Sequence, residues 1–344
     1  MGTLQLPADF QSSYENSVSY PQNLVYRASY PGALQVYTSR LDTAVKLLVE
    51  KDIDADVPFR DFRPTGQGAR KSSPLVTSIY LLTYKAFKKQ NIFSDAALKE
   101  WLGDQSTTDP NSSGFVATKV DPKCRFMWGN PIDLNSNSGC ANKSFSYSFL
   151  WAAHSRASLK ITRRMLVRIL SYHQVTPGYL DFISVFGTQS LPRDLRFSGF
   201  REQTLLNNSA RRRSVPALGR SGRQFQLCYN LKTVSCLSPI GTATKNKEWS
   251  IQQAAFHHQF DVDEGTTLWI VTKGDLEIKK RIQDMTGKDG GPEGKSFGTP
   301  AECFKSSLAV HLLNSHWSTE DWRWYVQWLE DVVDYEVKKT QVQT

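Results

Sequence analysis

Cysteine is scarce in this sequence of 344 residues, and the cysteines present form no recognisable metal or disulfide pattern. Their number is odd, and neither a C-x-x-C motif nor a Cys/His spacing joins them. Such usage is typical of a protein from a reducing compartment and argues against a zinc site. The five are Cys124, Cys140, Cys228, Cys236 and Cys303.

Long apolar runs are missing as well. No stretch reaches the roughly 18 apolar residues of a membrane-spanning helix. Residues 1–10 lack the basic segment and the following apolar segment of a signal peptide. We therefore expect neither a transmembrane helix nor a secretory signal, and a cytoplasmic location.

Catalytic signatures are also absent. There is no G-x-S-x-G elbow and no H-E-x-x-H pair. The loop at Gly294 does not fit a phosphate-binding loop, because Asp289 stands where the first glycine is needed. His257 and His258 are neighbours in a predicted strand, so their side chains point to opposite faces and cannot share a metal ion. We expect no catalytic residue and no enzyme.

Basic residues outnumber acidic ones by 42 to 33, a net charge of +9, but much of the excess lies in residues 211–223 and 273–281. Charge clusters of this kind are more often solvated than bound to a partner, so no nucleic acid is expected. Arg211, Arg212 and Arg213 are the candidates for holding a phosphate-bearing partner. The simpler interpretation is a flexible loop without a specific role.

The clearest structural pattern is in residues 248–273, EWSIQQAAFHHQFDVDEGTTLWIVTK. Apolar residues alternate first on odd and then on even positions, which predicts a strand with a bulge near Gln253. An Asp-Glu-Gly turn follows, and residues 267–272 have the composition of a strand buried on both faces. Residues 224–231 alternate cleanly and should pair beside this hairpin. We expect the hairpin to be the centre of a sheet.

Helical periodicity surrounds the hairpin. Thr299 begins a capping box with Pro300 at the first helical position. The buried side of the helix that follows is expected to be Phe304, Leu308, His311 and Leu312. Helices are also predicted for residues 33–51, 94–101, 161–173, 177–187, 275–285 and 318–338, with caps at Thr162 and Ser318 and with Arg163, Arg164 and Arg168 facing outward.

These elements predict an α/β (α+β) fold, with a mixed or antiparallel central sheet flanked by helices and a long C-terminal helix beginning at the end of the chain. Residues 1–30 are expected to be an extended N-terminal arm and residues 31–316 the main domain. Within it, residues 58–73 and 202–223 are predicted loops, and the polar residues 129–148 an insertion. The predicted core residues are Trp249, Phe256, Phe260, Trp269, Trp322 and Tyr325.

The last helix combines a wide aromatic face with an acidic face. An aromatic face of this width usually needs a neighbour to cover it. Glu330, Asp331 and Asp334 could supply oxygen ligands to Mg²⁺, which keeps most of its waters and needs only one or two carboxylates. The alternative, an ordinary solvated helix face, is the simpler interpretation.

Eight blocks of the sequence carry a resemblance to a known family. They are YPQNLVYR (20–27), YTSRL (37–41), DPKCRF (121–126), AHSRASLKITRRML (153–166), YHQVTPGYLDF (172–182), RFSGFR (196–201), the segment 249–274 and DWRWYVQWLED (321–331). In this order the chain resembles the N-terminal region of the fungal CorA-like transporter-domain proteins. In that family the CRF strand runs almost directly into the HSR segment, so residues 129–148 are a departure.

The resemblance implies a cytoplasmic α/β domain at the head of a divalent metal (Mg²⁺) transporter, with assembly or ion sensing as its role. It also implies that residues 317–344 begin a stalk helix through which a homo-pentamer forms at the cytoplasmic face of a membrane. The Gly-Met-Asn motif of the family's pore is absent, so this chain is not expected to conduct ions itself. The alternative is a free-standing intracellular protein-interaction module that keeps the fold.

Overall fold

The computed structural model describes residues 5–26, 31–43, 47–62, 87–104, 115, 117–127, 158–187, 197–207, 213–238, 247–272, 276–287, 290–291, 294 and 296–342. The predicted insertion at residues 129–148 lies outside these residues, and so do Arg211 and Arg212.

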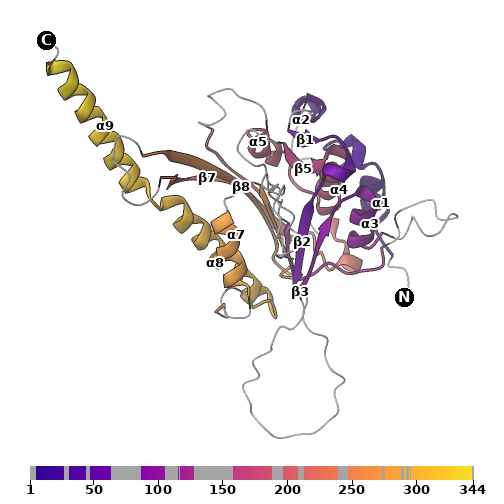
Figure 1. The fold of residues 1–344 in the computed structure, drawn as a ribbon. Coiled ribbons are helices and arrows are strands. Elements are labelled where there is room, and N and C mark those ends of the chain that lie inside the picture. The colour runs from indigo at the N-terminus through magenta and orange to yellow at the C-terminus, as the bar shows by residue number, and fades with distance from the viewer. Residues whose placement is uncertain are drawn as a thin grey trace, which may run out of the picture.

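A seven-stranded sheet in the order β3-β2-β4-β9-β8-β7-β6 forms the middle layer (Figure 1). All neighbouring strands are antiparallel except β4 and β9, which are parallel, so the predicted mixed and mainly antiparallel sheet is confirmed. The strands are β2 (Val57–Phe62), β3 (Phe87–Ile92), β4 (Cys124–Met127), β6 (Phe200–Leu205), β7 (Gln224–Cys236), β8 (Trp249–Asp261) and β9 (Thr267–Thr272). A separate pair, β1 (Leu48–Val49) and β5 (Leu159–Thr162), is parallel.

The hairpin β8–β9 lies in the centre of the sheet, as predicted. Gly265 in its turn has a φ of +68°, and a Cβ there would lie 2.7 Å from the Cα of Pro300, so glycine is needed for two reasons. The predicted bulge is wrong, because β7 and β8 pair without interruption over the whole of β8. The apolar residues change from odd to even positions because the first part of β8 is more exposed than the rest. Ile251 is half exposed, whereas residues 253–261 are buried.

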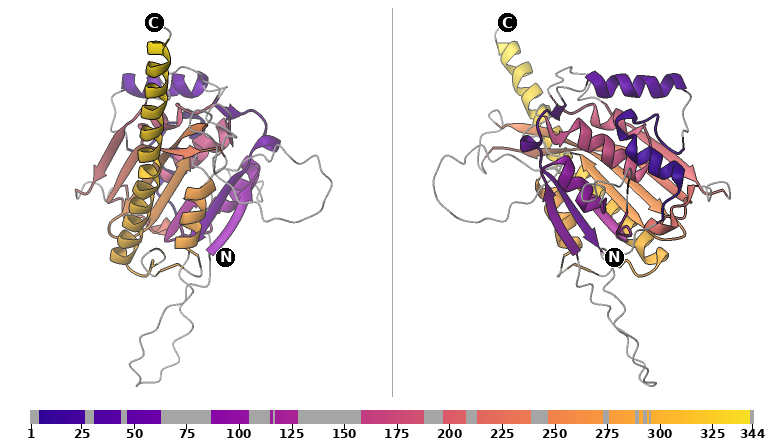
Figure 2. Two further views of the ribbon diagram at one scale, coloured as in Figure 1. Left: turned by 60° about the vertical axis from the view of Figure 1, so that its left-hand side comes forward. Right: turned by 90° about the vertical axis from the view of Figure 1, so that its right-hand side faces the viewer.

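Five helices lie on one side of the sheet, and the larger part of the hydrophobic core is on this side (Figures 1 and 2). Thr162 caps α4 as predicted, its Oγ1 accepting from the N–H of Met165 at 3.4 Å. Arg168 of α4 does not face outward as predicted but is buried in an ion pair with Asp95. The helices are α1 (Ala8–Glu15), α2 (Pro31–Thr43), α3 (Asp95–Leu102), α4 (Arg163–His173) and α5 (Tyr179–Ile183).

Helices α7 (Leu276–Met285) and α8 (Pro300–Thr319) cover the other face (Figure 1). The capping box at Thr299 is confirmed. The predicted buried side of α8 is wrong, since Phe304, Leu308 and Leu312 are exposed. Small and polar side chains let α8 lie close to the strands and satisfy their own hydrogen-bonding groups, as Ser307 does by donating to the carbonyl of Cys303 at 2.9 Å. The buried residues are Cys303, Ser306, Ser307, Val310, Asn314 and Trp317.

Three other predictions are corrected in the N-terminal half. Residues 1–30 are not an extended arm, because α1 and a 3₁₀ turn at Ser17–Ser19 lie within them and put Tyr14 and Tyr20 in the core. The predicted helix 33–51 ends at Thr43 and is followed by β1. The loop predicted from Pro58 is strand β2 as far as Phe62. Proline is accommodated there because β4 pairs only with residues 59–62.

The predicted flexible loop 202–223 is also corrected. Its first residues belong to β6, which pairs with β7 at the edge of the sheet. Later in the segment, Pro216–Leu218 form a 3₁₀ turn and Leu218 is fully buried. A buried side chain and paired backbone make this part of the segment a fixed element of the fold.

Helix α9 (Trp322–Val342) follows α8 after a break at Asp321, where φ is +61°. Ser318 is therefore not the cap of the last helix, because α8 continues through it to Thr319. The far end of α9 extends away from the body of the domain (Figure 1).

Candidate functional site

The first turns of α9 are held against the ends of β7 and β8 by aromatic side chains. The ring of Trp249 lies 5.5 Å from that of Tyr325 and 6.4 Å from that of Trp328, and these two α9 rings stack at 5.6 Å. An ion pair between Arg281 of α7 and Glu320 joins α7 to the break before α9. These contacts fix the direction in which α9 leaves the domain.

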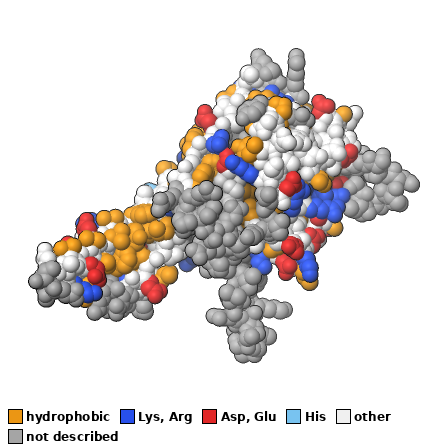
Figure 3. Space-filling view, turned by 90° about the horizontal axis from the view of Figure 1, so that it is seen from above, with side chains coloured by type: hydrophobic (Ala, Val, Ile, Leu, Met, Phe, Trp, Pro, Cys, Tyr) orange, Lys and Arg blue, Asp and Glu red, His pale blue; other side chains and the backbone are white. Residues whose placement is uncertain are grey.

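Alongside and beyond these contacts, α9 carries a row of exposed aliphatic side chains. Val326, Leu329, Val333 and Val337 follow each other at three and four residue steps, so they lie on one side of the helix. They are 40% to 59% exposed. We call these four residues the aliphatic stripe, and hydrophobic side chains cover much of the projecting helix in Figure 3. A contiguous exposed apolar surface is typical of an interaction site.

The candidate metal ligands lie beside the aliphatic stripe on α9, with Glu330 four residues after Val326 and Asp331 furthest around the helix from the stripe. Glu330, Asp331 and Asp334 are exposed, and Gln327 donates a hydrogen bond to Asp331 at 3.3 Å. Among the residues that the structure describes, no group of three or more His, Cys, Asp or Glu side chains could hold a metal ion. A cation here would be held by one or two carboxylates and its own waters.

The predicted core residues divide into two groups. Phe256, Phe260 and Trp269 are buried between the sheet and α8. Trp249, Trp322 and Tyr325 are only partly buried, and Tyr325 contacts both of the others at the base of α9.

His257 and His258 point to opposite faces of the sheet, each into a buried environment. His257 lies 5.3 Å from the ring of Tyr179 in α5, and burial lowers its pKa to about 3. His258 stacks on Trp269 at 4.2 Å. The pKa of His258 is lowered well below its usual range, mainly by burial and to a smaller extent by the neighbouring His311 and His257. Both rings are therefore neutral near pH 7.

A hydrogen-bonded chain continues from His258 into α8. Nδ1 of His258 lies 3.0 Å from Nε2 of His311. Nδ1 of His311 in turn lies 2.8 Å from the hydroxyl oxygen of Tyr229. Asn314 donates to that hydroxyl at 3.2 Å. Burial lowers the pKa of His311 to about 4. The sequence pattern identified His311 as a core position but gave no indication of these partners.

A buried ionic cluster lies on the face of the sheet opposite to α8, and the sequence patterns did not predict it. Arg125 of β4 donates to both oxygens of Asp61 in β2 at 2.8 and 2.7 Å. Asp121 lies 3.7 Å from Arg125 and accepts from Arg220 at 2.6 Å and from Tyr172 at 2.9 Å. The only sequence signal was that Asp121 and Arg125 belong to the DPKCRF block.

Arg213 is the one member of the predicted arginine triplet that the structure describes. Its guanidinium carbon lies 3.8 Å from the centre of the Tyr26 ring, a cation–π geometry. The triplet thus contributes at least one residue with a fixed position beside the domain.

Three further findings bear on identity. Within the described part of the chain, no helix is both long enough and apolar enough to span a bilayer. Comparison with curated proteins and with solved structures gave no match. The sequence model of one family, described as CorA-like transporters, matches residues 12–131 and 129–341. The two segments overlap where the predicted insertion begins, and together they span almost the whole chain, so the chain belongs to the family of CorA-like transporters.

Proposed function

We propose that this chain is the cytoplasmic domain of a divalent metal transporter for Mg²⁺, and that α9 begins the stalk helix through which copies assemble. The homo-pentamer of the family is the proposed assembly. The observation that carries the proposal is the aliphatic stripe on a helix that projects from a domain matching the CorA-like transporters. In the proposed assembly, the aliphatic stripe of one copy packs against the aliphatic stripe of another copy.

The expected strength of this association follows from the size of the stripe. Fully burying an aliphatic side chain contributes about 1.5–3 kcal/mol, so half-exposed side chains contribute on the order of 1 kcal/mol each. Association costs about 4–15 kcal/mol in lost translational and rotational freedom. Isolated chains should therefore associate weakly and with a strong dependence on concentration. Copies held together at a membrane would have a high effective concentration and would associate stably.

Charges placed in the stripe should abolish this association. In the double variant Leu329→Glu, Val333→Glu, two carboxylates would have to be buried or held close together between helices. We expect sedimentation velocity to show only monomer at concentrations where the unmodified chain forms larger species. Gln327→Glu is the matched control, because Gln327 is exposed on the same helix but outside the stripe. Equal behaviour of the double variant and the control would refute assembly through the stripe.

We further propose Mg²⁺ sensing by the acidic side of α9, through Glu330, Asp331 and Asp334. Each is exposed, and Glu330 and Asp334 are one turn apart. Mg²⁺ that keeps its waters needs only one or two such carboxylates. Sensing would couple ion concentration to the helix that also carries the stripe.

Mg²⁺ binding to the folded chain should raise its melting temperature, since a ligand that binds only the native state stabilises that state. We expect a higher Tm in millimolar Mg²⁺ than in chelator, and loss of the difference in the double variant Glu330→Gln, Asp334→Asn. An unchanged Tm in the unmodified chain would exclude sensing while leaving the assembly proposal intact.

A protein-interaction module is the second candidate function. It is favoured by the exposed row Phe304, Leu308 and Leu312 on α8, which lies outside the stripe. A chain that remains monomeric at every concentration, with or without the glutamates in the stripe, would favour this candidate over assembly.

A further inference from the structure

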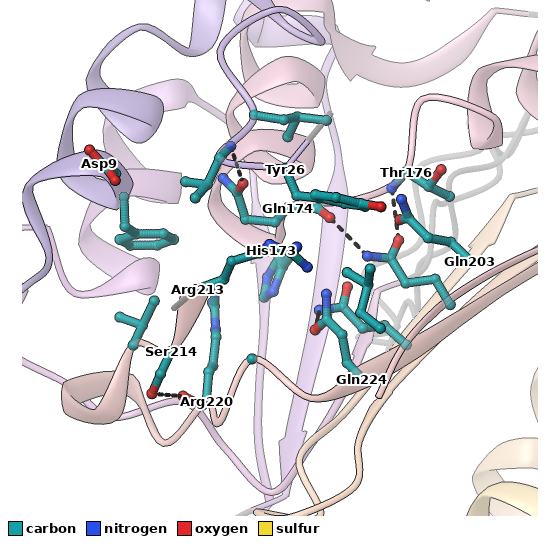
Figure 4. A pocket seen from close by; sticks show the side chains of 18 of the residues that line it. Asp9, Tyr26, His173, Gln174, Thr176, Gln203, Arg213, Ser214, Arg220 and Gln224 are labelled. Carbon is teal, nitrogen blue, oxygen red and sulfur yellow. Dashed lines mark hydrogen bonds between the residues drawn. The ribbon is translucent and has the colours of Figure 1, made fainter. Parts of the chain in front are cut away.

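A cavity of about 60 Å³ lies between the N-terminal segment, the end of α4 and the strands β6, β7 and β8. Figure 4 shows Tyr26, His173, Arg213 and Arg220 around it. Residues that are far apart in the sequence meet here, so the site exists only in the folded domain. None of its residues belongs to α9.

Arg220 contributes a hydrogen-bond donor that has no partner. Its Nε donates to Asp121 at 2.6 Å and its Nη1 donates to the carbonyl of Tyr172 at 2.6 Å. These two bonds fix the guanidinium plane, and the side chain is 11% exposed. The remaining nitrogen, Nη2, is buried without a hydrogen-bond partner in the described structure. A buried donor of this kind is costly unless a ligand or water accepts from it.

Arg213 contributes a second such donor and a positive charge. Its Nη1 is buried and unpartnered, and the guanidinium is held over the ring of Tyr26. The charges of Arg125 and Arg220 are balanced by Asp61 and Asp121. Arg213 forms no ion pair with any residue that the structure describes, so its charge is left for a ligand.

The carboxylate of Asp9 also lines the cavity, and Asp9 is exposed. Its charge is therefore well solvated and weakens the attraction for an anion only modestly. The buried part of the lining remains dominated by the donors of the two arginines.

Glutamine side chains form the opposite wall. Both polar atoms of the Gln226 amide have a partner, since it accepts from the N–H of Thr176 at 2.7 Å and donates to the carbonyl of Gln174 at 2.9 Å. Gln259 donates to Gln224 at 2.7 Å, which leaves its Oε1 buried without a partner. The buried, unpartnered polar atoms of the described lining residues are therefore two cationic donors and one neutral acceptor.

We propose that this cavity binds a phosphate group, with Arg213 and Arg220 donating to its oxygens and Gln259 accepting from its hydroxyl. Phosphate near neutral pH carries both acceptor oxygens and, in its monoanion, an O–H donor. A carboxylate or sulfate has acceptors but no donor for Gln259, and arginine guanidinium groups suit the geometry of phosphate oxygens. The size of the cavity fits the group itself, carried free or on a small molecule whose remainder extends toward solvent.

Isothermal titration calorimetry of the full chain tests the proposal by measuring the heat of binding. The probes are inorganic phosphate, glycerol phosphate, sulfate and acetate at matched ionic strength. We expect saturable binding of phosphate or glycerol phosphate, tighter than that of sulfate or acetate. The tighter of the first two shows whether the group is bound free or as a monoester. Loss of one hydrogen bond to a charged group is worth about 1.5–3 kcal/mol, so Arg213→Gln should weaken binding by about tenfold to a hundredfold.

Arg223→Gln is the matched control, because Arg223 is in the same segment but pairs with Asp263 at 2.7 Å and does not line the cavity. Its binding should equal that of the unmodified chain. Gln259→Leu should remove the preference for phosphate over sulfate, and an unchanged circular dichroism spectrum would verify folding. The proposal is overturned if phosphate does not saturate, if Arg213→Gln binds normally, or if Arg223→Gln loses affinity equally.

Discussion

Replacing Arg125 by methionine is expected to destabilise the domain by about 3–5 kcal/mol, the cost of removing one partner from a buried ion pair. Arg125 and Asp61 are both almost completely buried and form two parallel hydrogen bonds across β4 and β2. Methionine would leave the buried Asp61 carboxylate on β2 without its cation. Asp121 would also lose one of its two guanidinium neighbours.

Urea unfolding followed by circular dichroism measures this effect. Arg164→Met is the matched control, because Arg164 also contacts a carboxylate, that of Asp95 at 2.9 Å, but is 68% exposed. Exposed pairs contribute about 0–1 kcal/mol. Similar losses of stability in the two variants would contradict a special role for the buried cluster.

Mild acid is expected to destabilise the domain, because three buried histidines and the partly buried His311 are held as neutral rings. Burial lowers the pKa of His257 to about 3 and that of His311 to about 4. Burial, and then Arg125, Arg220 and His257, lower the pKa of His173 well below its usual range. Burial likewise lowers the pKa of His258, the last of these four histidines, well below its usual range.

The direction follows from proton linkage. In the unfolded chain a histidine titrates near 6.5, so below that pH the unfolded state binds protons that the native state does not. Stability is fully present above about pH 6.5 and falls as the pH is lowered toward 4. At pH 5, about 1.5 pH units below the value in the unfolded chain, His257 and His311 each cost ~2 kcal/mol, a large fraction of the stability of a typical domain. His173 and His258 act in the same direction.

Urea unfolding between pH 7 and pH 5 tests the linkage. His257→Leu should flatten the decline, because both ring nitrogens of His257 are buried without a hydrogen-bond partner and no bond is lost. His316→Gln should leave the decline unchanged, since His316 is exposed. A stability that does not change over this range would contradict the buried neutral histidines.

Alternation was sufficient to predict the central strands. Residues 224–231 and 267–272 have side chains that repeat every two residues or are apolar throughout, and both are strands in the centre of the sheet. The pattern was misleading in α8, where Ser306 and Ser307 are buried and Leu308 is exposed. Apolar periodicity assumes that the largest apolar side chains face the core. Close approach of a helix to a sheet instead favours small ones.

The candidate sites were predictable only in part. The stripe on α9 follows from helical spacing, which is local information. The ionic cluster joins Asp61 to Arg125 across 64 residues, and the cavity joins Tyr26 to Arg213. Such pairs depend on strand order and on the path of the N-terminal segment. No local pattern in the sequence encodes either of these.

Sedimentation equilibrium of the unmodified chain over a wide range of concentration tests assembly through the aliphatic stripe most directly. We expect a weight-average mass that rises above the 38.9 kDa of the single chain as concentration increases. A mass that stays at that value at every concentration would contradict it.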